Sequence, residues 1–338
     1  MTRAGILPQG WVLVFGLAFA AACSAENGAR DEVSRQLDRR VSTLSPVAWA
    51  EHHVLFFWRF DQFIASAGGS GRVACDSTGL YTVEIGSKAT PWKVGEQICN
   101  VLWSVDRIQM SHDRSALLYS DRLEAGGVSR LDVDQLSRTP LVQYCLPFGA
   151  GPSWSPDERT IAFVGDCVGS DRLALHLANA DGSAARPVGS PSGSAREEYP
   201  SWAPDGSHIA VARRRTSMES WESEIVVVDT MMGERRALTR GYAPAWSPTS
   251  EWIAYLRQDS SHTSPPSIRL IHPDTSGDRE LLRGGLAGVE AAGQSERWVS
   301  GPLVWSPDGS RLAFSRGASI WVISVDGSGL EAVVPVAR

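Results

Sequence analysis

The chain has 338 residues, of which 43% are apolar and 21% charged, and its formal net charge is −6. This composition is typical of a folded globular protein and excludes an intrinsically disordered chain. The charges have mixed signs without a long basic run, which argues against a nucleic-acid partner.

The first predicted element is an export signal. Arg3 precedes an uncharged apolar run at 11–22, which is too short to cross a bilayer about 30 Å thick as a helix. The run ends in FAAAC, which resembles the lipobox of bacterial lipoproteins, where diacylglycerol is attached to the cysteine. We therefore expect a signal peptide at 1–22, lipidation of Cys23, and a tether or short amphipathic helix up to residue 45. Cleavage by the ordinary signal peptidase, leaving a soluble protein, is the alternative.

Repeated hairpin pairs are expected from residue 46 onward, and the first two copies are weak. SGRVAC (70–75) is followed by GLYTVEIGSK and TPWKVG, which are three candidate strands. MSHDRSALLY (110–119) is followed by VSRLDVDQ and TPLVQYC. Both segments align with the better-marked copies that come later in the chain.

The four strong copies are WSPDERTIAF (154–163), WAPDGSHIAV (202–211), WSPTSEWIAY (246–255) and WSPDGSRLAF (305–314). Pro presets φ for a turn, Asp can accept a hydrogen bond from the backbone two residues on, and Gly tolerates a positive φ. The phrase therefore predicts a tight hairpin whose apolar second strand lies between neighbouring sheets. A second pair of strands follows each copy. We expect Trp154, Trp202, Trp246 and Trp305 to be core residues.

Four meandering strands per repeat are the unit of a β-propeller blade. The sequence thus predicts an all-β fold, a six-bladed β-propeller of four-stranded antiparallel blades over 46–338. The expected blades are 46–97, 98–146, 147–190, 191–241, 242–284 and 285–338. HVLFFWRF (53–60) is a lone strand in this scheme. It either belongs to the first blade or pairs with the last blade and closes the ring.

Four cysteines remain after Cys23: Cys75, Cys99, Cys145 and Cys167. An even number in an exported protein predicts disulfides. We favour Cys75–Cys99 and Cys145–Cys167, because each pair is close in sequence and falls within adjacent blades. Free buried thiols are the alternative. No C-x-x-C spacing occurs, which disfavours a redox or zinc role.

The pattern W-S-P-D-G-x-x-I-A-F, followed by I-W-V-x-x-x-D-G, resembles the WD40-like repeats of TolB-type propellers and of prolyl oligopeptidase propellers. The resemblance covers about 63–335 and is strongest over 151–335. It implies the fold, whereas function must be argued from the site. We expect neither the N-terminal α/β domain of TolB nor the hydrolase domain of prolyl oligopeptidases in this chain, so neither activity is implied.

Aspartates recur at the expected turns, once or twice in most blades. They are Asp113, Asp157, Asp181, Asp205, Asp308 and Asp326. Their repetition around a ring indicates turn formers rather than catalytic acids or metal ligands. The seven histidines lack H-x-x-x-H and H-x-E spacings, and G-x-S-x-G is absent. We expect no catalytic residue, metal or cofactor, although a metal site assembled from distant blades stays open.

Long connecting segments at 213–224, 257–267 and 285–301 are expected to share one face, opposite the short turns. Recognition usually resides in long loops on a rigid scaffold. Arginine, tryptophan and histidine in these loops offer stacking and charge-assisted contacts. The candidate ligand-binding residues are Arg213, Arg214, Arg215, Trp221, Arg257, His262, Arg297 and Trp298. Variable, solvated loops are the alternative.

These features predict a non-catalytic exported binding or scaffold protein. It would recognise an envelope protein or glycan through the long-loop face, while a lipid holds it to the membrane at the periplasm or cell surface. We expect a monomer. The alternative is a carbohydrate-active or peptide-active enzyme with its site at the mouth of the central channel, and a largely structural envelope lipoprotein is a third possibility.

Overall fold

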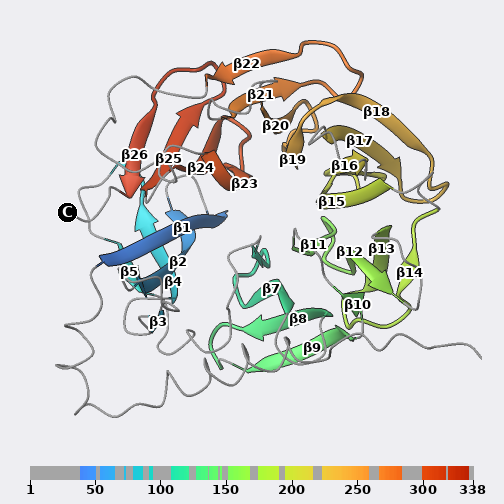
Figure 1. The fold of residues 1–338 in the computed structure, drawn as a ribbon, viewed down its shortest axis with the longest axis horizontal. Coiled ribbons are helices and arrows are strands. Elements are labelled where there is room, and N and C mark those ends of the chain that lie inside the picture. The colour runs from blue at the N-terminus through green and yellow to red at the C-terminus, as the bar shows by residue number, and fades with distance from the viewer. Residues whose placement is uncertain are drawn as a thin grey trace, which may run out of the picture.

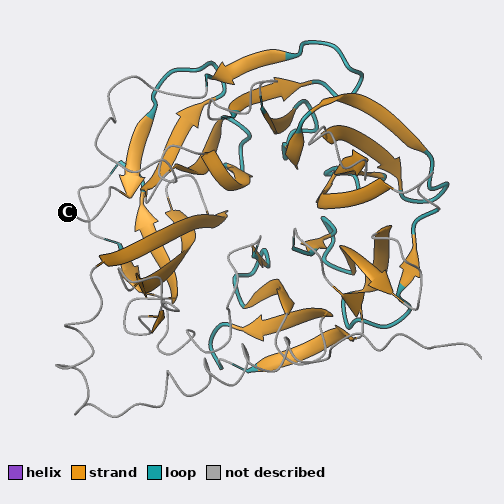
Figure 2. Ribbon diagram, viewed as in Figure 1, coloured by secondary structure: helices purple, strands orange, loops and turns teal. Residues whose placement is uncertain are grey.

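The computed structural model arranges antiparallel sheets around a central axis, as Figure 1 shows. Every regular element that it describes is a β-strand (Figure 2). In the described part of the chain, no helix is long and apolar enough to cross a membrane. The structure describes residues 39–50, 54–64, 72–73, 79–86, 91–93, 108–121, 127–135, 137–143, 145–146, 151–167, 174–189, 195–215, 223–258, 266–283, 299–316 and 319–334.

Each sheet is built from strands that are consecutive in the chain. The first holds β1 (Arg39–Ala50), β2 (Val54–Ile64), β3 (Arg72–Val73), β4 (Gly79–Glu84) and β5 (Trp92–Lys93). The second holds β6 (Gln109–Met110), β7 (Ala116–Asp121), β8 (Gly127–Asp132) and β9 (Arg138–Gln143). The third holds β10 (Cys145–Leu146), β11 (Ser153–Trp154), β12 (Thr160–Cys167), β13 (Ala174–Asn179) and β14 (Arg186–Pro187).

The last three sheets are regular meanders. The fourth holds β15 (Ala195–Trp202), β16 (His208–Arg215), β17 (Ser223–Asp229) and β18 (Arg235–Arg240). The fifth holds β19 (Tyr242–Trp246), β20 (Ile253–Arg257), β21 (Ser267–Ile271) and β22 (Arg279–Leu282). The sixth holds β23 (Val299–Trp305), β24 (Arg311–Arg316), β25 (Ser319–Ser324) and β26 (Glu331–Val334).

The predicted six-bladed ring of uniform four-stranded blades is wrong, because the first and third sheets have five strands each. In the third sheet, β11 pairs with the start of β12 and β10 pairs with its end, so two short strands share one long partner. In the first sheet, β4 pairs with the start of β2 and β3 with its end. Backbone groups on a long strand need partners along its whole length, and the extra short strands supply them.

The structure decides between the two placements that the sequence left open for HVLFFWRF. Residues 54–60 lie in β2 of the first sheet, which pairs with β1 and β4. Of SGRVAC, the described residues Arg72 and Val73 form the short strand β3. Trp49 pairs with Leu55 as Trp154 pairs with Ile161. The first sheet therefore begins with the same Trp hairpin as the strong copies, with a turn one residue shorter. β1 begins at Arg39, inside the range expected for the tether.

The hydrophobic core lies between the sheets. The second strand of each strong copy is buried on both sides: Leu312, Ala313 and Phe314 are all fully buried. Clusters of apolar side chains join neighbouring sheets, and one of them joins the sixth sheet to the first. That cluster contains Trp49 and Phe57 together with Ile320 and Val322. Packing rather than an exchanged strand therefore closes the ring between these two sheets.

A buried serine organises the short turn of most copies. Ser155 Oγ donates to Asp157 Oδ1 at 2.6 Å and accepts a hydrogen bond from Thr160 N at 3.0 Å. Ser306 Oγ makes the same two kinds of bond, to Asp308 Oδ1 and from Arg311 N. Gly309 has a φ of 70° in this turn, which agrees with the predicted role of glycine. The Asp residues thus act as turn formers here, as the sequence predicts.

Candidate functional site

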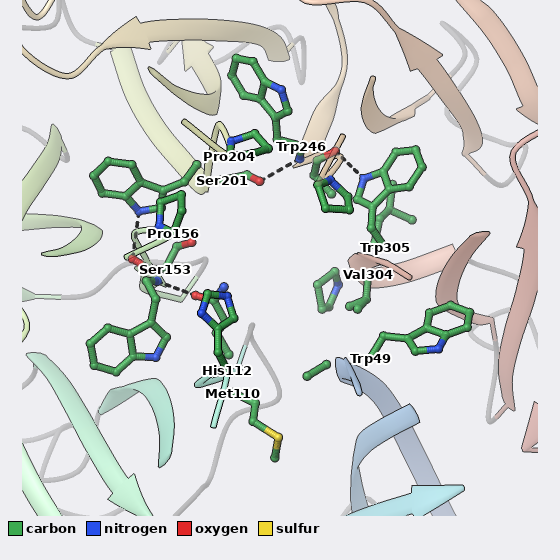
Figure 3. A pocket seen from close by; sticks show the side chains of 18 of the residues that line it. Trp49, Met110, His112, Ser153, Pro156, Ser201, Pro204, Trp246, Val304 and Trp305 are labelled. Carbon is green, nitrogen blue, oxygen red and sulfur yellow. Dashed lines mark hydrogen bonds between the residues drawn. The ribbon is translucent and has the colours of Figure 1, made fainter. Parts of the chain in front are cut away.

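A cavity of about 500 Å³ opens at the centre of the ring, on the face that carries the short turns (Figure 3). Each sheet contributes the end of its inner strand, and most add the start of the following turn. We call it the central cavity. Its walls include Ala48, Trp49, Gln109, Met110, His112, Pro152, Ser153, Trp154, Pro156, Pro200, Ser201, Trp202, Pro204, Trp246, Pro248, Pro302, Val304, Trp305, Ser306 and Pro307.

Hydrogen bonds between neighbouring sheets fix this wall. Trp305 Nε1 donates to Ala245 O at 2.9 Å, and Trp202 Nε1 donates to Ser153 O at 3.2 Å. The backbone N–H of Trp246 donates to Ser201 Oγ at 2.9 Å. Each bond joins a tryptophan to the preceding sheet, and Figure 3 shows these bonds around the cavity rim. The cavity is therefore formed before any ligand arrives.

The wall is mainly apolar. Seven prolines and five tryptophans line it, together with a few serines, Gln109 and His112. None of the lining residues in the described part of the chain is Asp, Glu, Lys or Arg. Such a surface offers van der Waals contact and hydrogen bonds, which suits binding.

His112 is the one histidine among the described residues that line the cavity. It is 74% exposed, and its Nδ1 lies 3.5 Å from Glu158 Oε1. The backbone N–H of His112 also donates to Glu158 Oε1, at 2.6 Å. Glu158 thus ties the turn of the second sheet to the turn of the third.

The turn aspartates are held in their charged form by their own turns. The backbone N–H of Ser115, followed by the Ser111 and Ser115 hydroxyls, lowers the pKa of Asp113 to about 2. The Ser155 hydroxyl and the Arg159 N–H lower the pKa of Asp157. Across the described residues, no three His, Cys, Asp or Glu side chains gather as a metal site would require.

The predicted long-loop residues are described only in part. Arg213 Nη2 lies 2.9 Å from Glu224 Oε1, Arg214 Nη2 lies 3.2 Å from Glu198 Oε1, and Arg257 Nη1 lies 3.7 Å from Asp278 Oδ2. These three arginines therefore pair with carboxylates of their own sheets. The pairs of Arg213 and Arg214 lie at the strand ends opposite the short turns, whereas Asp278 directly precedes β22. Burial raises the pKa of Glu198, although Arg214 opposes that shift. Trp221, His262, Arg297 and Trp298 lie outside the described residues, as does the side chain of Arg215.

Two of the predicted cysteines lie on neighbouring strands. Cys145 of β10 and Cys167 of β12 are direct partners in the antiparallel register, and nothing is described of their side chains. Cys23, Cys75 and Cys99 lie outside the described residues, so lipidation and the Cys75–Cys99 pairing stay predictions.

Sequence reasoning gave the mouth of the central channel as the alternative site, but it named none of the residues that line the cavity, because it treated the tryptophans as core alone. Trp154 and Trp305 are indeed buried, whereas Trp202 and Trp246 are only partly buried. The repeated segments GPSW (151–154), YPSW (199–202) and APAW (243–246) carried a usable signal. A proline two residues before the tryptophan recurs in all three segments, and Pro152 and Pro200 line the cavity.

No protein-family model matches the chain, and no curated protein sequence matches it. Among solved structures, TolB from Acinetobacter baumannii is similar, with a TM-score of 0.53 and 15% identity over 89% of this chain. This chain spans 65% of that protein. A putative TolB from Agrobacterium tumefaciens gives 0.51 and 21% identity, over 67% of this chain and 79% of that one.

Oligogalacturonate lyase from Vibrio parahaemolyticus is also similar, with a TM-score of 0.52 and 11% identity over 88% of this chain and 92% of that one. The neighbours thus include an enzyme besides the TolB proteins. At these identities the likeness shows the fold alone, since one fold hosts many functions. The chain is an all-β propeller similar in fold to TolB and related proteins.

Proposed function

We propose that this protein is a non-catalytic binding protein of the bacterial cell envelope, whose central cavity takes part of a protein or glycan ligand. The observation that carries this proposal is the wall of the cavity. Residues from all sheets form it, inter-sheet hydrogen bonds fix it, and none of its described side chains is Asp, Glu, Lys or Arg. A preformed apolar pocket with a few polar groups is the usual form of a binding site.

The proposal includes the place of the protein in the cell. The segment 1–22 directs export, and Cys23 carries a lipid that holds the propeller at a membrane. A disulfide between Cys145 and Cys167 is compatible with an oxidising compartment. The register of β10 and β12, which sets these two residues opposite each other, supports the pairing.

The experiment is affinity capture with the native protein, followed by mass spectrometry of the retained partners. Ala48→Trp and His112→Trp place bulky side chains at the cavity from two different sheets. We expect both variants to lose the partners that the unaltered protein retains, while their melting temperatures stay close to its own. Trp221→Ala and Trp298→Ala are the matched variants on the predicted long-loop face.

The two faces give opposite results in this design. Loss of partners in the cavity variants, with retention in the loop variants, supports the central cavity. The reverse result would assign recognition to the long-loop face and overturn the role of the cavity.

An enzyme active on carbohydrates or peptides is the second candidate. His112 favours it, because an exposed imidazole at the cavity rim could move a proton. A screen on polysaccharides and peptides, with and without divalent metal ions, tests this candidate. Activity that disappears in His112→Ala would establish the enzyme and refute the binding role as the main one.

A further inference from the structure

A second hollow, of about 400 Å³, lies between the third and fourth sheets on the short-turn face. The turn after β11 forms one side of it, and the turn after β15 forms the other. Pro156, Trp202 and Pro204 line both this hollow and the central cavity. The two hollows are therefore neighbours that share a wall. We call the second hollow the radial groove.

An exposed pair of methionines stands at the outer end of the radial groove. Met231 and Met232 are 86% and 74% exposed, and they are the exposed large hydrophobic side chains among the described residues. Met231 itself lines the groove. Asp229 Oδ1 accepts hydrogen bonds from the backbone N–H groups of both methionines, at 2.8 and 2.6 Å. The tip that carries them is thus held in a defined shape.

The corresponding tips of the third, fifth and sixth sheets are polar. They read ADGS (180–183) in the third sheet, PDTSG (273–277) in the fifth and VDGSG (325–329) in the sixth. Exposed methionine is adaptable and is common on surfaces that bind other proteins. The fourth sheet therefore departs from its neighbours at the one tip that borders the groove.

The walls of the radial groove carry negative charge. Asp157 and Asp205 line it from the two facing turns, and Arg186 is the cationic side chain among its lining residues. The serine hydroxyls Ser155 and Ser207 lower the pKa of Asp157 and Asp205 respectively. Both carboxylates are therefore charged at neutral pH, and they favour a cation on the ligand.

We propose that the radial groove binds an extended peptide segment of a partner protein. A lysine or arginine of that segment lies near Asp157 and Asp205, and an apolar side chain packs on Met231 and Trp202. Grooves lined by aromatic side chains and prolines suit extended or polyproline-like chains. The proposal rests on the proposed binding role of the short-turn face, and it names the ligand as a basic and apolar peptide.

The test begins with selection of short random peptides, displayed on phage, against the full chain. We expect the enriched peptides to share one basic and one apolar residue at a constant spacing. A synthetic peptide of that consensus then gives dissociation constants by fluorescence anisotropy. Binding should weaken as salt is added, because the charges lie at a solvent-accessible surface.

Variants of the groove separate its two contacts. Asp157→Asn combined with Asp205→Asn keeps the turn acceptors and removes both charges, and we expect binding to weaken by about tenfold. Met231→Ser should weaken binding by about tenfold, because it removes apolar contact area. Asp181→Asn combined with Asp326→Asn is the matched control, since these turns lie outside the groove. The control should bind like the unaltered protein.

Several results would overturn the proposal. They are enrichment of peptides without a basic residue, equal binding by the groove variants and the control, and the absence of any enriched peptide. If binding instead depends on Ala48 and His112 but not on the groove residues, the central cavity remains a binding site and only the radial groove is refuted. The failure of this inference is thereby distinguishable from the failure of the proposed function.

Discussion

At the scale of single residues, the serine of W-S-P-D has a structural function that the fourth sheet lacks. Ser111, Ser155 and Ser306 each donate to the turn aspartate and accept a backbone N–H from the second strand. Ala203 occupies this position in the fourth sheet and is buried. The backbone is the same there, because Ala203 N donates to His208 O at 2.8 Å just as Ser155 N donates to Thr160 O at 2.8 Å.

This comparison predicts opposite effects for two substitutions. Ser155→Ala should lower the free energy of unfolding by about 1–2 kcal/mol, because it removes the acceptor of the Thr160 N–H and leaves the Asp157 carboxylate with the Arg159 N–H alone. Ala203→Ser should raise it by about 0.5–1 kcal/mol, since it restores both hydrogen bonds. Chemical denaturation measures both. A destabilising Ala203→Ser would show that the fourth turn has no room for the hydroxyl.

At the scale of elements, a buried ion pair joins the third and fourth sheets. Glu197 of β15 is fully buried, and its Oε1 accepts a hydrogen bond from Arg235 Nε at 2.6 Å. Its Oε2 accepts from Leu175 N of the third sheet at 2.9 Å, while Arg235 Nη2 donates to Val188 O at 2.7 Å. Both members of the pair thus also bond to the backbone of the neighbouring sheet.

Removing one charge of this buried pair should destabilise the folded protein strongly. Glu197→Gln leaves Arg235 buried without its counter-charge, and we expect the free energy of unfolding to fall by about 3–5 kcal/mol. Glu224→Gln is the matched control, because its pair with Arg213 is partly exposed and should contribute about 1 kcal/mol or less. Equal losses for the two variants, measured by urea denaturation, would refute a special role for the buried pair.

The strands β10 and β12 give a second prediction at this scale. Cys145 and Cys167 are register partners. A disulfide between them would close a loop in the unfolded chain and raise the free energy of unfolding by about 3 kcal/mol. Mass spectrometry of the non-reduced exported protein should show these two residues linked. Cys145→Ser should then lower the melting temperature of the non-reduced protein. Free thiols in the exported protein would contradict the pairing.

The sequence predicted the elements best where the turn chemistry was explicit. W-S-P-D-G encodes a hairpin through Pro, Asp and Gly, so the strands around 154, 202, 246 and 305 were placed correctly. The hairpin at Trp49 lacks Pro, Asp and Gly and is one residue shorter, so the sequence left open whether β2 belongs to the first sheet or pairs with the last. The additional strands of the first and third sheets, β3 and β10, could not be predicted, because they are too short to show the alternation of apolar and polar residues that marks a strand. Met231 is apolar, and only the structure shows it to be exposed.

At the scale of the whole molecule, packing between the first and sixth sheets closes the ring. Each sheet consists of consecutive strands, so no strand in the described ranges is exchanged between the chain's two ends. The closure depends instead on the apolar cluster around Trp49 and Val322, and on one further contact. The Arg311 guanidinium of β24 lies over the Trp49 ring, with its carbon 5.2 Å from the ring centroid. Trp49 thus has two functions, since it also lines the central cavity.

A double-mutant cycle tests this closure. Trp49→Ala should lower the free energy of unfolding by about 3–5 kcal/mol, because it removes a large buried side chain from the junction. Arg311→Gln should lower the free energy of unfolding by less. In the Trp49→Ala background the same substitution should have an effect smaller by about 0.5–1 kcal/mol, because the cation–π contact is already absent there. Urea denaturation of the four proteins measures the coupling. Strictly additive losses would mean that β24 and β1 do not interact through this pair, and closure would then depend on the apolar cluster alone.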